Sequence, residues 1–399
     1  MKRRHILQSV GGIAAASTLG IAVTGTAVAD CDKITPNGPF PPETAAENYQ
    51  GFLSNEQLYD RLHRLENRSN VEYEEIGETW EGRPIPYATI GSGDFHVFHT
   101  TQQHGDEQPG TEAALDVLQV LGNGRGNDDI LDEVTIHVIP RHNPDGWAPA
   151  GDNETPTRSN ARPESECHDN PYASWWQPTT QCGPVDPNRQ HYFQFDDQTL
   201  AQVDPDAFDA DVGIPDENPS PETQAMLDKV EEVGADLVVD WHTQFTYYDD
   251  DCDMINVSMA WPYNEAAPDE AVDLSKRGVA ALRDGVQGRA NGNVSRYPGG
   301  TTVNIARNAH GVAGRGSILI EQRGQASELN NASRGQLVRH AKFMFDNLHA
   351  ELASGALFER SPDEVDDLQN FHNNSFWKDL PEEQQAEAEA WWEEERHSH

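Results

Sequence analysis

The sequence contains little positive charge. Lys and Arg together number 28 in 399 residues, whereas Asp and Glu number 68, so the formal net charge at pH 7 is -40. A charge of this size repels the phosphates of nucleic acids and the headgroups of anionic lipids. The composition therefore argues against nucleic acid as a partner and against stable association with a membrane.

Lysine is the scarcer of the two basic residues, and the acids are spread along the chain instead of forming a single block. This pattern is typical of proteins that work in concentrated salt. At about 1 M salt the Debye length falls to roughly 3 Å, so the repulsion among carboxylates is screened. We expect the fold to weaken at low salt. An acidic protein from an ordinary environment is the alternative that composition leaves open.

Long hydrophobic runs are absent beyond the N-terminus, so no later stretch is expected to span a membrane. The chain begins with Lys2-Arg3-Arg4, continues with an apolar stretch to Val23, and then has Ala27-Val28-Ala29. This combination is typical of a twin-arginine export signal with a small-residue cleavage site. Residues 1–29 are therefore predicted to be a signal peptide and the protein to be secreted. A lipid anchor on Cys31 is the cell-surface alternative.

Cysteine is rare as well, with four residues in the chain. Export would permit disulfide bonds. Cys167 and Cys182 flank a segment rich in Pro and Trp, and we predict that they pair. Cys31 and Cys252 could form a second bridge or remain free.

The chain shows no evident internal repeat, and composition divides it into three parts after the signal. Residues 30–48 are rich in Pro and lack periodicity, which predicts a linker. Residues 49–357 carry alternating strand and helix patterns, which predict one globular domain. Residues 358–399 are dominated by acids, Gln and Trp, which predicts an acidic tail without a chemical role.

Strands and helices alternate in the predicted domain. Strand-like apolar runs are found at 71–76, 85–90, 95–98, 134–139, 236–240, 254–259 and 317–320, and helical spacing at 54–65, 111–121, 220–234, 271–286 and 337–348. The alternation predicts an α/β fold: a mixed, mostly parallel twisted sheet with helices on both faces. In such sheets, functional sites gather at the carboxyl ends of strands.

His104 and Glu107 follow one predicted strand and precede a helix. A loop in this position can turn an imidazole nitrogen and a carboxylate towards one divalent ion. His242 follows the buried-strand pattern 236–241 and is the candidate for a third ligand. Three protein ligands with one open position are typical of catalytic zinc. The sequence therefore predicts one Zn²⁺ per chain.

An ordered series of motifs over roughly residues 49–350 resembles the zinc carboxypeptidase family, the carboxypeptidase A-like metallopeptidases. With the export signal and the acidic composition, the chain resembles a secreted, haloarchaeal-type member of that family. The series is Gly82-Arg83-Pro84-Ile85, His104-x-x-Glu107, Asn143-Pro144-Asp145-Gly146, Asp186-x-Asn188-Arg189, His242, Tyr297 and Glu321. The resemblance implies that His104, Glu107 and His242 are the zinc ligands and that Asp186 orients the first of them.

The same resemblance implies how the reaction runs. Glu321 matches the family's catalytic base for zinc-activated water, and its place after Ile318-Leu319-Ile320 would raise its pKa by desolvation. Arg158 matches the arginine that stabilises the oxyanion, with Arg162 as the second choice.

Substrate contacts follow from the resemblance too. Asn188 and Arg189 match the pair that grips the terminal carboxylate of the substrate. Tyr297 matches a mobile tyrosine that closes over it. The uncharged segment 301–304 favours a neutral or apolar terminal residue. The expected activity is hydrolysis of the C-terminal bond of peptides with a free C-terminus.

Other functions stay open at this point. Gln103-His104-Gly105-Asp106-Glu107 also resembles the N-acyl amino acid deacylases of the same superfamily, and Asp106 stands where digestive carboxypeptidases have Arg. A cell-wall peptide amidase could use the same site. A non-catalytic peptide-binding module is the alternative outside enzymes. The sequence indicates neither the physiological substrate nor the oligomeric state.

Overall fold

A computed structural model describes residues 52–124, 127–147, 156–174, 177–244, 249, 253–290, 292–324 and 331–370. The predicted signal peptide and linker, Cys31, Cys252 and residues 371–399 of the predicted tail lie outside the described residues.

Eight strands of the described residues form one mixed sheet, in the order β1-β2-β4-β3-β7-β10-β8-β9. The strands are β1 (Glu72–Glu78), β2 (Pro84–Ile90), β3 (Phe95–Thr101), β4 (Val134–Ile139), β7 (Leu237–Gln244), β8 (Ile255–Ala260), β9 (Asn293–Arg296) and β10 (Gly316–Arg323). The central strands β4, β3, β7 and β10 run parallel to one another, and β8 pairs with β10 in the antiparallel sense. The predicted mixed α/β sheet is confirmed.

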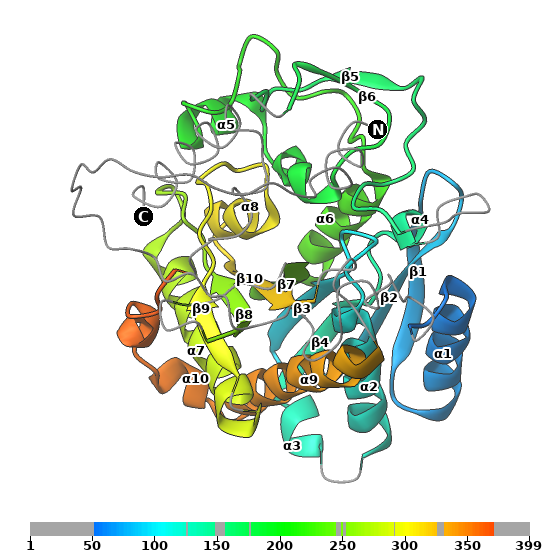
Figure 1. The fold of residues 1–399 in the computed structure, drawn as a ribbon, viewed down its shortest axis with the longest axis vertical. Coiled ribbons are helices and arrows are strands. Elements are labelled where there is room, and N and C mark those ends of the chain that lie inside the picture. The colour runs from blue at the N-terminus through cyan, green and yellow to red at the C-terminus, as the bar shows by residue number, and fades with distance from the viewer. Residues whose placement is uncertain are drawn as a thin grey trace, which may run out of the picture.

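Helices cover both faces of the sheet. They are α1 (Asn55–Arg68), α2 (Pro109–Asn123), α3 (Asp128–Leu131), α4 (Pro144–Trp147), α5 (Asp197–Val203), α6 (Pro221–Val233), α7 (Asp269–Ala290), α8 (Ala306–Val312), α9 (Asn331–Ser354) and α10 (Ala356–Glu359). Figure 1 shows α2, α7 and α9 below the sheet and α6 and α8 above it.

Alternation along the strands decides which side chains face which layer. Val97 of β3 and Val239 of β7 join the large core under α2, α7 and α9, whereas Phe98 and Val238 join a smaller core that includes Met226 of α6. Even-numbered residues of β7 therefore face the α6 side. His242 is one of them.

Local signals in the sequence explain where the helices begin and end. Ser54 forms the predicted capping box of α1 with Gln57. Ser220 caps α6 ahead of Pro221, and Gly234 ends that helix with a φ of 60°, a conformation that glycine adopts without a steric penalty.

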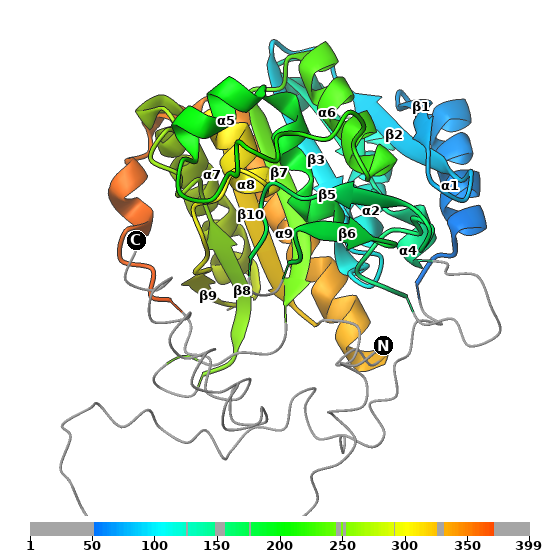
Figure 2. The same cartoon turned by 90° about the horizontal axis from the view of Figure 1, so that it is seen from above.

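The segment from 156 to 219, which the sequence left without regular structure, contains short elements. A hairpin of β5 (Cys167–Asp169) and β6 (Thr180–Cys182) is closed by the predicted Cys167–Cys182 disulfide. Two 3-10 turns, Pro187–Arg189 and His191–Gln194, follow it. Figures 1 and 2 show this segment over the same face as α6 and α8.

The packed structure continues beyond the predicted domain end at 357. Helix α10 and a 3-10 turn at Pro362–Val365 bury Leu357 and Val365, and Arg360 pairs with Glu351 and Asp284. The first part of the predicted tail is thus packed against α7 and α9. Across the described residues, none of the helices combines the length and the apolar character needed to cross a membrane.

Candidate functional site

Three predicted metal ligands come from two neighbouring parallel strands. His104 and Glu107 lie in the loop between β3 and α2, and His242 lies on β7 beside β3. Residue 105 in this loop has to be glycine, because a Cβ atom on it would lie 2.0 Å from the carbonyl carbon of Gly146. Glycine at this position therefore lets the ligand loop pack closely against the Asn143–Gly146 turn.

The three side chains meet at one buried point. His104 Nδ1 lies 2.8 Å from Glu107 Oε1 and 3.0 Å from His242 Nδ1, and His242 Nδ1 lies 2.9 Å from Glu107 Oε2. Each of these residues is no more than 3% exposed. One ligand atom from each lies within 4.8 Å of the others, a spacing that suits a single ion.

Two further carboxylates fix the orientation of the imidazole rings. His104 Nε2 lies 3.0 Å from Asp186 Oδ1, and His242 Nε2 lies 2.8 Å from Asp240 Oδ2. A carboxylate only accepts hydrogen bonds, so each Nε2 carries the proton and each Nδ1 presents a lone pair. Two lone pairs and the Glu107 carboxylate therefore face one another, and a cation between them satisfies all three.

Electrostatics at the site favour a cation as well. Although burial opposes protonation of His242, the carboxylates of Asp240 and Glu107 raise its pKa well above the usual value. The surroundings are thus strongly negative. Two nitrogens and a carboxylate are a donor set that zinc takes in catalytic sites. The residues present fit the metal.

Glu321 lies beside the three candidate ligands. It is opposite His242 in the register of β10 and β7, so both side chains point to the same face of the sheet. Glu321 is half-buried, and desolvation by the surrounding protein raises its pKa to about 7. A carboxyl group with this pKa can accept a proton and release it near neutral pH.

Of the two arginines considered for the oxyanion, Arg158 lies at the site. Its Nε donates to Asp186 Oδ2 at 2.8 Å, and its guanidinium lies 3.8 Å from Glu107 Oε1. Arg162 points elsewhere: it contacts His168 Nδ1 at 2.7 Å and the Gln181 carbonyl oxygen at 3.4 Å, both in the disulfide hairpin.

The predicted substrate-binding residues occupy different surroundings. Asn188 Oδ1 accepts from the Ala306 N–H at 2.9 Å, which ties the turn to α8, and Asn188 Nδ2 lies 3.2 Å from His242 Nε2. Arg189 interacts electrostatically with Asp186, Tyr297 and Glu321, and burial lowers the pKa of its guanidinium. Tyr297 interacts electrostatically with Glu321 and Arg189, and burial raises the pKa of its hydroxyl group.

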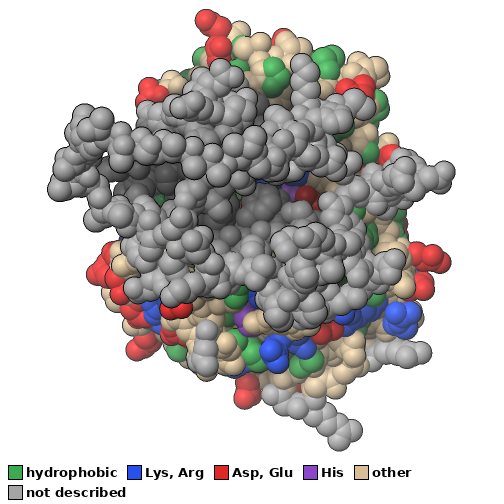
Figure 3. Space-filling model, viewed as in Figure 1, with side chains coloured by type: hydrophobic (Ala, Val, Ile, Leu, Met, Phe, Trp, Pro, Cys, Tyr) green, Lys and Arg blue, Asp and Glu red, His purple; other side chains and the backbone are tan. Residues whose placement is uncertain are grey.

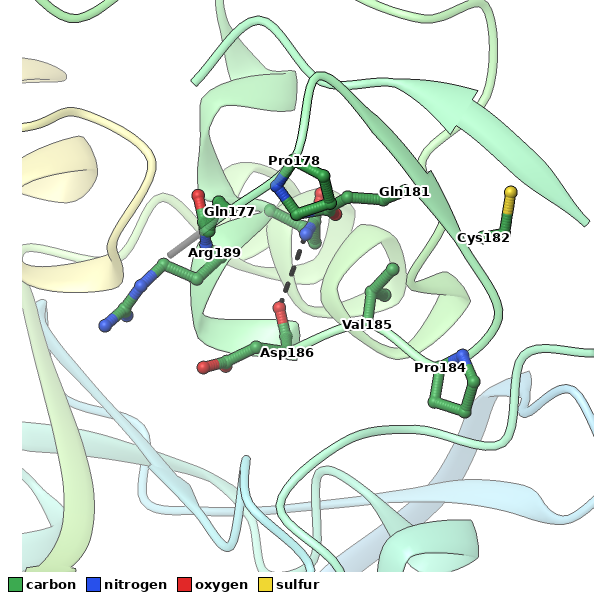
Figure 4. A pocket seen from close by; sticks show the side chains of 9 residues that line it. Gln177, Pro178, Gln181, Cys182, Pro184, Val185, Asp186 and Arg189 are labelled. Atoms are coloured by element: carbon green, nitrogen blue, oxygen red, sulfur yellow. Dashed lines mark hydrogen bonds between the residues drawn. The ribbon is translucent and has the colours of Figure 1, made fainter. Parts of the chain in front are cut away.

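A small cavity of about 210 Å³ lies next to the turn that carries Asp186 and Arg189. Its lining comes from the hairpin segment and from the turn that follows it: residues 177, 178, 181 and 182, and residues 184–186, 189 and 190. Figure 4 shows the carboxylate of Asp186 and the guanidinium of Arg189 pointing away from Cys182 and Pro184.

Asp240 is a site residue that the sequence analysis did not single out as functional. The signal was available, since Asp240 and His242 are two residues apart on a predicted strand and so share a face.

Gln102 was missed too. It is buried with a φ of 58°, the only non-glycine residue with positive φ among those described. Its amide accepts from Arg141 Nε and donates to the Gly105 carbonyl, which braces the ligand loop. A backbone conformation of this kind has no reliable signature in a single sequence.

Two motifs of the series contact each other away from the proposed ligands. Asp145 accepts hydrogen bonds from Thr79 Oγ1 at 2.7 Å, from the Glu81 N–H at 3.0 Å and from Arg83 at 2.5 Å. The 143–146 turn is thereby fastened to the β1-β2 connection. Its neighbour Gly146 accepts from the Thr157 N–H at 2.7 Å, close to Arg158.

Fold and site together indicate an α/β protein with a metal-binding site, and comparison with known proteins identifies the family. A family model described as zinc carboxypeptidase matches residues 58–330. The chain belongs to the zinc carboxypeptidase family, and on that membership it is a zinc-dependent metallopeptidase. Comparison with curated protein sequences gave no match.

Solved structures share the fold at low sequence identity. A metallo-carboxypeptidase from Burkholderia cenocepacia is 18% identical, with a TM-score of 0.52 over 77% of this chain and 70% of that one. Carboxypeptidase A from Helicoverpa armigera is 18% identical, with a TM-score of 0.55 over 76% and 74%. Bovine thrombin-activatable fibrinolysis inhibitor is 13% identical, with a TM-score of 0.53 over 77% and 99%. These similarities concern the fold.

Proposed function

We propose that the protein is a secreted zinc metallocarboxypeptidase that removes the C-terminal residue of peptides, with one zinc ion held by His104, Glu107 and His242. The observation that carries the proposal is the convergence of two carboxylate-oriented imidazoles and Glu107 beside Glu321 and Arg189. Zinc, when bound there, acts as a Lewis acid that activates water and polarises the scissile carbonyl.

Residues of the chain supply the remaining chemistry. Glu321 takes a proton from the attacking water and later delivers it to the leaving amine, a role that its pKa of about 7 supports. Arg158, held by Asp186 beside Glu107, stabilises the negative charge that develops on the carbonyl oxygen. Asp186 and Asp240 keep His104 and His242 in the tautomers that bind metal.

Recognition of a free C-terminus is assigned to Arg189, whose planar guanidinium can hold a carboxylate through two parallel hydrogen bonds. Asn188 supports this arrangement from the same turn. Tyr297, which interacts electrostatically with Glu321 and Arg189, covers the C-terminus of the bound peptide.

Export is part of the proposal. Its support is the basic and apolar pattern of residues 1–29, and the Cys167–Cys182 disulfide is compatible with an oxidising compartment.

The proposal is tested with purified, zinc-replete protein in molar salt on three substrates: a peptide with a free C-terminus, its C-terminal amide, and an N-acyl amino acid. We expect release of the last residue from the free acid only, and loss of that activity with a chelator. Cleavage of the acyl amino acid alone would identify a deacylase. Lack of turnover on all three would favour a binding module.

A further inference from the structure

Two loop segments that carry proposed site residues are joined away from the site. Arg158 and Asp186 contact each other through a hydrogen bond of 2.8 Å. Two residues after Arg158, the Asn160 N–H donates to the Val185 carbonyl, and the Val185 N–H donates to Asn160 Oδ1, both at 3.0 Å. Val185 directly precedes Asp186. Asn160 therefore links the two segments close to the residues that must meet.

The side chain of Asn160 is held in turn by the first turn of α6. Its Nδ2 donates to the Pro219 carbonyl at 3.1 Å and lies 3.2 Å from Glu222 Oε2, which also accepts from Ser220 Oγ at 2.9 Å. Because a backbone N–H can only donate and a carbonyl can only accept, these partners permit one orientation of the amide.

The same helix turn grips the segment that carries Asp186 at a second point. Thr223 Oγ1 donates to the Pro187 carbonyl at 2.9 Å. Asn160 is 3% exposed and Glu222 is fully buried, so water cannot replace a lost partner without a rearrangement. None of these groups contacts the proposed ligands or the proposed substrate site.

We propose that Asn160 is a positioning residue, supported by Glu222, that sets Arg158 against Asp186 and thereby fixes the carboxylate that orients His104. The effect on catalysis rests on the proposed function of Arg158. The effect on metal binding rests on the contact between Asp186 and His104 and on the proposed role of His104 as a ligand, but not on the proposed activity.

Burial raises the pKa of Glu222 to about 7, so the carboxyl group is largely protonated below neutral pH. Glutamine is a close mimic of that form and retains an oxygen for Asn160 and Ser220. Glu222→Gln is therefore the conservative variant, and Glu222→Leu is the variant that removes the support.

The test compares Asn160→Ala, Glu222→Leu and Glu222→Gln with wild type in zinc affinity, measured by competition with a chelator, in kcat and KM on a free-acid peptide, and in thermal unfolding. Asn170→Ala is the matched control. Asn170 is also a buried asparagine of the loop, but its side chain bonds to Pro178 and Tyr172, in the hairpin region.

We expect Asn160→Ala and Glu222→Leu to weaken zinc affinity by about tenfold or more and to lower kcat by about ten- to a hundredfold, with KM little changed. Glu222→Gln should keep both values near wild type. Asn170→Ala should lose stability while keeping zinc affinity and kcat. If Asn160→Ala does not fold, Asn160→Asp, which keeps the acceptor for Val185 but removes the donor, should show the same losses.

Unchanged zinc affinity and kcat in a folded Asn160 variant would overturn the proposal, as would equal losses in Asn170→Ala. If the wild-type protein releases no C-terminal residue, the proposed function fails, but the zinc affinities still decide whether Asn160 positions Asp186.

Discussion

At the scale of single residues, Glu321 carries the proposed proton transfers. We expect Glu321→Gln to lower kcat by about 10²- to 10⁴-fold, because an amide cannot accept the proton of the attacking water. Zinc content should not change, since Glu321 is not a proposed ligand. Normal turnover in a zinc-loaded Glu321→Gln protein would exclude this residue as the base.

The pH profile tests the same residue. Desolvation raises the pKa of Glu321 to about 7, and a base works in its deprotonated form, so kcat/KM should rise with pH up to that region and then level off. A cation beside the carboxyl favours the charged form, which moves this limb to lower pH. The measurement is kcat/KM between pH 4 and 9. A rate that falls with pH across this range would contradict the assignment.

Arg189 is expected to act on substrate affinity. Its proposed partner, the terminal carboxylate, is remote from the scissile bond, so Arg189→Ala should raise KM by roughly ten- to a hundredfold, with a smaller effect on kcat. Steady-state kinetics on the free-acid peptide and on its amide provide the comparison. A variant that still prefers the free acid as strongly as wild type would rule out this role.

At the scale of elements, the alternation of side chains along β7 places Asp240 and His242 on one face of the sheet, with Asp240 Oδ2 2.8 Å from His242 Nε2. Asp240→Asn removes the charge that holds the Nε2 proton of His242, and we expect zinc affinity to fall by about 10- to 100-fold. Asp236→Asn is the matched control, because Asp236 precedes the same strand but bonds the His96 N–H at 2.8 Å. Equal affinities in both variants would count against Asp240 as an orienting group.

Elements with periodic apolar patterns and clear end signals could be predicted from the sequence. Ser54 and Gly234 mark real helix ends, and Ser317 to Ile320 lies within a real strand. The described residues between 156 and 219 could not be predicted in this way. Their arrangement depends on a disulfide and on buried side-chain contacts such as those of Asn160, which have no periodicity to detect.

The candidate site, too, could be predicted from the sequence only in part. His104, Glu107, Asp186 and Glu321 were predicted because they lie at strand ends or in recognisable motifs, and the structure brings them together. Asn188 was predicted as a substrate contact, yet its amide also contacts His242 and Ala306. Such a contact depends on how α8 lies against a distant turn, and sequence spacing does not reveal that.

At the scale of the whole molecule, the net charge of -40 predicts that stability depends on salt concentration. Figure 3 shows acidic side chains scattered around the described part of one face. Because salt screens repulsion among them, we expect the melting temperature to rise by several degrees between about 0.1 and 2 M salt. Thermal unfolding at a series of salt concentrations is the measurement. A melting temperature that falls or stays constant would contradict salt adaptation.

The zinc site is the central claim, and anomalous diffraction at the zinc edge from crystals of the zinc-loaded protein tests it most directly. We predict one strong peak per chain, at about 2.0–2.2 Å from the Nδ1 atoms of His104 and His242 and from a carboxylate oxygen of Glu107. A peak bound by other residues, or no peak in a protein that releases C-terminal residues, would contradict the account.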